Sequence, residues 1–85
     1  MKHAGDRGLD ELEPLLAQVR TLPSLIEKKR GIFHRKSKAF LHFHEDAAGL
    51  FADIKVSGDG DYTRLRVSTG AERKRFVAFV RMSLK

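Results

Sequence analysis

KAFLHFHEDAAGLFADIKV, residues 38–56, is the stretch that decides the fold. On both sides of the turn-like segment 45–49, apolar residues alternate with polar or aromatic ones. Successive side chains of a β-strand point to opposite faces, so this alternation predicts two half-buried strands. The short segment between them predicts an antiparallel hairpin.

The parity of the hairpin predicts two different sheet faces. If the apolar residues share one face, the paired residues place His42 opposite Asp53 and His44 opposite Phe51. The core face then comprises Leu41, Phe43, Ile54 and Val56. With a later strand around 62–67, the second face collects Phe40, His42, His44, Phe51, Asp53, Lys55, Tyr62, Arg64 and Arg66.

Helical patterns flank these strands. Apolar residues at spacings of three and four predict an amphipathic helix that begins at Glu13 or Pro14 and ends before Pro23. Thr69 and Glu72 have the spacing of a capping box and predict the start of a C-terminal helix. Residues 31–35 predict one more strand, and residues 57–61 a second turn.

These elements predict a single α+β domain over residues 9–85, preceded by a disordered tail at residues 1–8. We expect a two-layer sandwich in the order helix, antiparallel sheet of three or four strands, helix. Both helices are expected to bury their apolar stripes against the core face of the sheet.

Composition narrows the functional classes. The 85 residues contain no cysteine, which excludes disulfides and thiolate metal sites and fits a cytoplasmic location. No run approaches the length of a membrane span. We expect neither an enzyme nor a cofactor, because no nucleophile–base set or glycine-rich phosphate loop is found and so short a chain leaves little room for a pocket.

The net charge of +6 is unevenly distributed. Residues 24–44 carry six basic side chains and one acidic one, and residues 62–85 carry seven and one. A basic surplus favours anionic partners. Since aromatic side chains stack on bases and cations hold phosphates, we expect a non-enzymatic binding module, with single-stranded nucleic acid as the leading partner. Its contacts would be Phe40, Phe51, Lys55, Tyr62, Arg64 and Arg66.

Two alternatives use the same face. Phe40 and Phe51 are large for an exposed surface, which favours an interface with a second copy of the chain. His42 and His44 project the same way from one strand, and Asp53 on the partner strand would complete a metal-ligand set. Repulsion from Arg64 and Arg66 ranks this metal site below anion binding.

Residues 12–56 also contain short motifs that are similar to those of a known protein family. Leu22-Pro23, Lys38-Ala39-Phe40 and Asp53-Ile54-Lys55-Val56, with Glu27, Phe33, Asp46 and Gly49 between them, resemble the opening of the MmcQ/YjbR-like families. The resemblance implies a small bacterial α+β protein of a group labelled DNA-binding, without an assigned role for any residue. The chain departs from that pattern after residue 56, since it is shorter and has no tryptophan.

Overall fold

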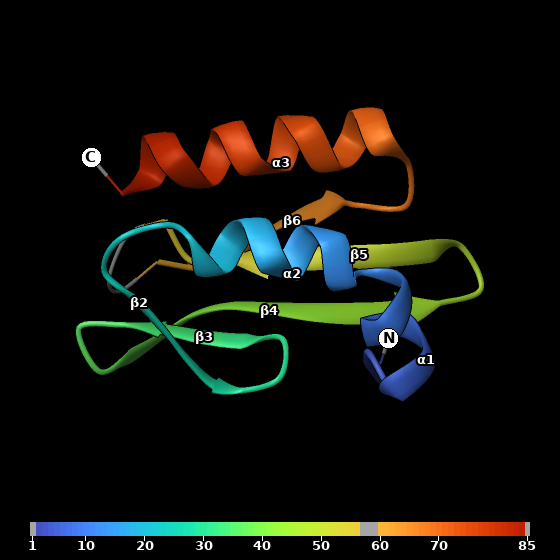
Figure 1. Cartoon of the computed structure of the whole chain (residues 1–85), viewed down its shortest axis with the longest axis horizontal. Coiled ribbons are helices and arrows are strands. Elements are labelled where there is room, and N and C mark those ends of the chain that lie inside the picture. Colours follow the sequence, from blue (N-terminus) through green and yellow to red (C-terminus); the bar gives the residue numbers. More distant parts are fainter. Residues whose placement is uncertain (1, 57–59, 85) are drawn as a thin grey trace.

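The computed structural model describes residues 2–56 and 60–84, and it has mixed α+β architecture with an antiparallel sheet, as expected. In chain order the elements are β1 (Lys2–His3), α1 (Asp6–Glu11), α2 (Glu13–Arg20), β2 (Leu25–Lys29), β3 (Ile32–Arg35), β4 (Lys38–Asp46), β5 (Gly49–Ile54), β6 (Thr63–Arg66) and α3 (Gly70–Ser83). Figure 1 shows α2 and α3 running alongside the sheet. No helix in the described ranges is long and apolar enough to span a bilayer.

The expected order of helix, three or four strands and helix is wrong. Within residues 2–56 and 60–84 the sheet has six strands, ordered β2-β3-β4-β5-β6, with β1 paired to β4. The expected tail is wrong for residues 2–8, because they form β1 and begin α1, whose Leu9 is buried in the core. The remaining tail residue, Met1, and residues 57–59 of the expected second turn lie outside the described residues.

The β4–β5 hairpin has the predicted register. Leu41 pairs with Ile54, His42 with Asp53 and His44 with Phe51. The apolar side of this hairpin packs against α2 and α3 in one core cluster. Its fully buried large side chains are Leu12, Leu15, Leu16, Val19, Phe33, Leu41, Ile54, Val67, Phe76 and Val80. Val56, expected in the core, follows the end of β5 and is 45% exposed.

A bulge in β4 changes the position of Phe40. The pairing of β3 with β4 shifts by one residue between Phe33↔Leu41 and His34↔Ala39, which leaves Phe40 as an extra residue. Strict alternation fails at such a bulge. Phe40 is therefore not exposed on the second face, as predicted, but is 4% exposed, within the core cluster.

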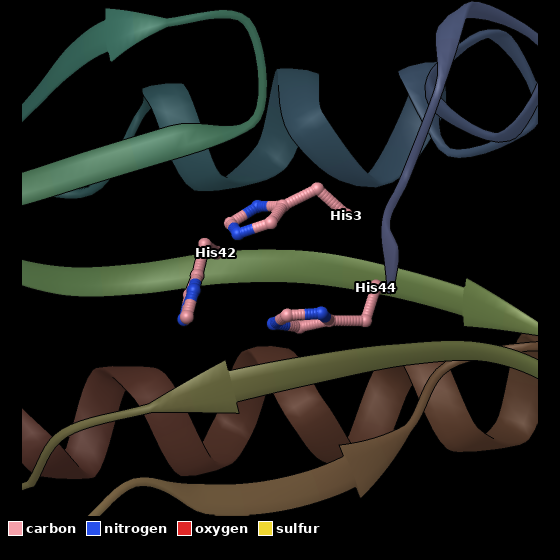
Figure 2. A group of neighbouring side chains, drawn as sticks. All are labelled: His3, His42 and His44. Carbon is pink, nitrogen blue, oxygen red and sulfur yellow. The ribbon is translucent and has the colours of Figure 1, made fainter. Parts of the chain in front are cut away.

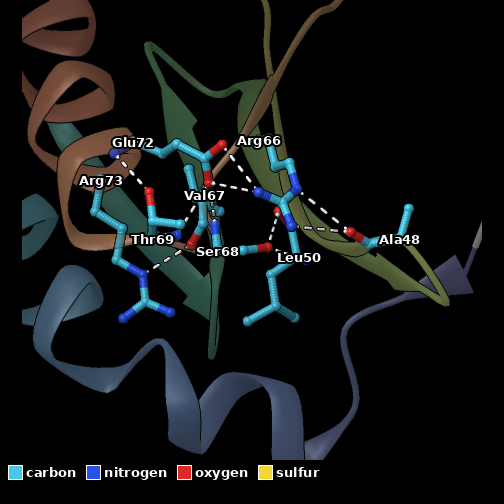
Figure 3. A network of polar contacts seen from close by, with 8 residues as sticks. All are labelled: Ala48, Leu50, Arg66, Val67, Ser68, Thr69, Glu72 and Arg73. Carbon is cyan, nitrogen blue, oxygen red and sulfur yellow. Dashed lines mark hydrogen bonds and ion pairs between the residues drawn. The ribbon is translucent and has the colours of Figure 1, made fainter.

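Polar contacts fix the start of α3 against the hairpin (Figure 3). The predicted capping box is present, because Thr69 Oγ1 accepts from the Glu72 backbone N–H at 3.1 Å and Glu72 accepts in return from that of Thr69. Ser68 Oγ accepts a 2.8 Å hydrogen bond from the Leu50 N–H. Gly49, at φ +132°, lies so close that a Cβ there would be 2.4 Å from Ser68 Oγ, so only glycine fits.

The bulge leads to a stability prediction. Replacing Phe40 by alanine removes a buried aromatic ring and should lower the free energy of unfolding by about 3–5 kcal/mol. The control, Val56→Ala, changes a half-exposed side chain and should cost under about 1 kcal/mol. Chemical denaturation of the two variants measures both values. Equal losses would mean that Phe40 is not part of the core.

Candidate metal centre

The side chains of two β4 histidines lie on the sheet face opposite the core. His42 and His44 are two residues apart in a regular part of the strand, so their side chains project in the same direction. The neighbouring core residues Leu41 and Phe43 are only 1% and 2% exposed. Figure 2 shows both imidazoles in front of the sheet, with the helices behind it.

β1 contributes a third histidine, His3, to this group. β1 pairs with the end of β4, which β3 does not reach, and puts His3 directly opposite His44. The ring centroid of His3 lies 4.7 Å from that of His44 and 5.2 Å from that of His42. The centroids of His42 and His44 are 4.7 Å apart. The three rings point toward one another (Figure 2). Sequence reasoning missed His3 because it assigned this segment to a disordered tail.

The imidazole nitrogens of this cluster lie close enough together to be candidate metal ligands. One nitrogen from each of His3, His42 and His44 can be chosen so that all lie within 4.8 Å of one another. His42 Nε2 and both ring nitrogens of His44 are buried without a hydrogen-bond partner among the described residues. His44 Nε2 lies 3.2 Å from Asp53 Oδ2, but without the direction of a hydrogen bond. Buried nitrogens without partners are costly, unless a ligand uses them.

The electrostatic environment favours neutral imidazoles. Burial, with a contribution from the neighbouring His44 and His3, holds the pKa of His42 below its usual 6.5. Burial also lowers the pKa of His44, although the Asp53 carboxylate acts in the opposite direction. A neutral imidazole keeps a free lone pair, which is the form that binds a metal.

Asp53 lies opposite His42, as predicted, but it is not a member of the three-residue cluster. The predicted set was His42, His44 and Asp53, whereas the tight cluster has His3 as its third member. Asp53, 5% exposed, accepts two 2.7 Å hydrogen bonds from Arg64, which lower the pKa of its carboxyl group below the usual 3.8. It lies beside His44. In many metal sites an acidic residue next to a ligating histidine orients that histidine.

Both arginines of this face are engaged by acidic partners. Arg64 forms its ion pair with Asp53, and Arg66 pairs with Glu72 at 3.1 Å. Arg66 also donates to the Ala48 carbonyl oxygen (Figure 3). The predicted repulsion of a cation by Arg64 and Arg66 is thus partly neutralised by carboxylates.

The remaining predicted residues of the face extend the cluster at one side. The Tyr62 ring packs edge-on against His42 with centroids 4.6 Å apart, and the Lys55 Nζ lies 5.0 Å from the Tyr62 centroid. Phe51 is half-buried between its register partners His44 and Arg66. Of the nine predicted residues, only Phe40 is buried in the core.

The lowered pKa values predict a pH dependence of stability. His42 and His44 titrate below 6.5 in the fold, so near neutral pH the unfolded chain binds more protons, and stability should fall as pH drops from about 7 to 5. His3, Asp53 and Arg64 face the same cluster. The carboxylates with lowered pKa values titrate below this window.

Urea unfolding at pH 7.5 and 5.5, with a chelator present, tests whether the histidine cluster causes this pH dependence. His42→Gln should reduce the loss of stability between the two pH values, while His34→Gln, a change outside the cluster, should reduce it less. An undiminished loss in His42→Gln would mean that the cluster does not cause it.

Comparisons of the chain with protein-family models, curated proteins and solved structures found no match. The resemblance of residues 12–56 to the MmcQ/YjbR-like families stays a prediction, and the functional argument rests on this chain's own residues.

Proposed function

We propose that this protein binds a divalent transition metal, with zinc as the reference ion, through His3, His42 and His44. The observation that carries the proposal is the convergence of three imidazole nitrogens within 4.8 Å, on a face where buried ring nitrogens have no other partner among the described residues. Histidine is the commonest metal-ligating side chain at neutral pH.

The geometry requires only a small adjustment. Nitrogens bound to tetrahedral zinc, each about 2.0–2.1 Å from the ion, lie roughly 3.3 Å apart. Side-chain rotations that bring the imidazoles together by an ångström or two satisfy this spacing. Three protein ligands leave one position of a four-coordinate ion for water or another small molecule, and the exposure of His3 makes the ion accessible.

A purely structural cluster of imidazoles explains the same residues less well. Contacts between aromatic rings contribute about 0.5–1.5 kcal/mol each. Each buried nitrogen without a partner costs about 1–3 kcal/mol, so the cluster alone gains little stability. A bound metal takes one nitrogen from each histidine and can thereby use two of these three buried nitrogens, one of His42 and one of His44.

The nucleic-acid and homodimer hypotheses stay predictions with weaker support. Arg64 and Arg66 already pair with carboxylates, and a phosphate would have to compete with those carboxylates. Phe40, which was to stack on bases or face a second copy, is buried in the core. Both hypotheses lose residues on which they depended, while the metal hypothesis gains His3.

Zinc should raise the melting temperature of this protein. Zinc at a hundredfold excess over its dissociation constant adds about 2.7 kcal/mol, which corresponds to an increase on the order of 10 °C for a domain of this size. His3→Ala removes one ligand from an exposed position and should abolish most of the increase. His34→Ala, which removes a histidine outside the cluster, should retain it.

Thermal unfolding at increasing zinc concentrations, after dialysis against a chelator, measures these shifts. No shift in the wild-type protein, or equal shifts in wild type and His3→Ala, would refute the three-histidine site.

Zinc should also slow the opening of β1. The Ala4 N–H donates a 3.1 Å hydrogen bond to the Phe43 carbonyl oxygen, next to His3, and this amide exchanges only when β1 leaves β4. Zinc should slow its hydrogen exchange by tenfold or more, since about 1.4 kcal/mol of added stability suffices.

The same measurement in His3→Ala should show no effect of zinc on Ala4. Slowed exchange in that variant would mean that zinc stabilises the fold from another site.

A further inference from the structure

A cavity lies beside the β3–β4 hairpin. It has a volume of about 270 Å³ and is lined by Arg35, Lys36, Lys38, Ala39, Phe40, Lys55 and Val56. Small-molecule sites have volumes of about 300–1,000 Å³, and this cavity lies just below that range, so it suits only a small ligand. The metal centre uses none of these side chains.

The charge of the lining is entirely positive. Four of its side chains are cationic and none is acidic. None of the four forms an ion pair with another described residue, whereas Arg20, Arg30, Arg64, Arg66 and Arg73 all do. Three of the unpaired cations of residues 24–44, Arg35, Lys36 and Lys38, thus line a concave site, and Lys55 is added just after β5.

Strand pairing brings two of these cations together. Arg35 and Lys38 are direct register partners on β3 and β4, where like charges destabilise a sheet. They flank a two-residue turn, Lys36-Ser37, with φ of +52° and +67°. An anion bound by both side chains would offset the repulsion of Arg35 and Lys38.

Arg35 also has an unused donor. One of its terminal nitrogens donates to the Ser83 carbonyl oxygen at 3.2 Å, and its guanidinium lies 6.0 Å from the Phe40 ring centroid. Its Nε is buried without an acceptor among the described residues. Arginine donors match the oxygens of phosphate, and lysines add point charges.

We propose that this cavity binds a small molecule that carries a phosphate group. The phosphate contacts Arg35, Lys36, Lys38 and Lys55, and the apolar remainder of the ligand packs on Ala39 and Val56. The shared chemistry is the phosphate itself, whether free or esterified.

Titrations with three probes test the proposal: inorganic phosphate, adenosine monophosphate, and adenosine without phosphate. A chelator is present, so that no phosphate binds through a metal at the histidines. Backbone amide NMR shifts should show saturable binding of both phosphate probes at residues 35–40 and 55–56, and adenosine should produce no saturable shift. Tighter binding of the ester than of free phosphate identifies phosphomonoesters as the ligand, and equal binding identifies free phosphate.

Lys38→Gln should weaken binding of adenosine monophosphate by about tenfold, the effect of one lost charged contact. The control, Lys28→Gln, removes the same charge from an exposed position on β2 outside the cavity and should have little effect. Both changes lie at the surface, and unchanged melting temperatures confirm intact folding.

Three results would overturn the proposal. They are the absence of saturable shifts with either phosphate probe at millimolar concentration, binding of adenosine as tight as that of its phosphate, and equal weakening by Lys38→Gln and Lys28→Gln. The last result would mean that net charge alone attracts the anion.

Discussion

The two-residue period of β4 is the constraint on which the rest of this structure depends. It directs Leu41 and Phe43 into the core beneath α2 and α3, and it directs His42 and His44 to the opposite face. A shift of the strand by one residue would bury the histidines and expose the core. The hydrophobic effect that holds the helices on the sheet therefore also holds the imidazoles in place.

Electrostatic pairing completes the histidine face. Asp53 is buried beside His44, and a carboxylate there would be expensive without a counter-charge. Arg64 provides that charge from the adjacent strand through two hydrogen bonds. The pair leaves a nearly neutral environment around the imidazoles. By contrast, the cations of the β3–β4 cavity have no such carboxylates among the described residues, so the two sites suit ligands of opposite charge.

Local patterns predicted the parts of this fold that depend on local chemistry. Alternation predicted the register of β4 with β5, and the spacing of Thr69 and Glu72 predicted the start of α3. The bulge at Phe40 was not predictable, because it arises from how β3 pairs with β4 and leaves no local signal. β1 was missed for the same reason: a two-residue strand has no period, and only its pairing partner defines it.

β1, the strand that was not predicted, also contributes His3 to the candidate metal centre. The weak signal of this strand in the sequence and its place in the centre have the same physical cause. β1 gains little from its own contacts, since both residues are exposed and they form two register pairs with β4. Ordering such a segment costs about 1–2 kcal/mol per residue in backbone entropy. A metal held by His3 and β4 would supply that free energy, so docking of the N-terminal segment and metal binding would be one coupled equilibrium. With its last ligand on a weakly held strand, the proposed metal centre would respond to metal concentration with a local change of structure, while the core formed by β4 and the helices would stay in place.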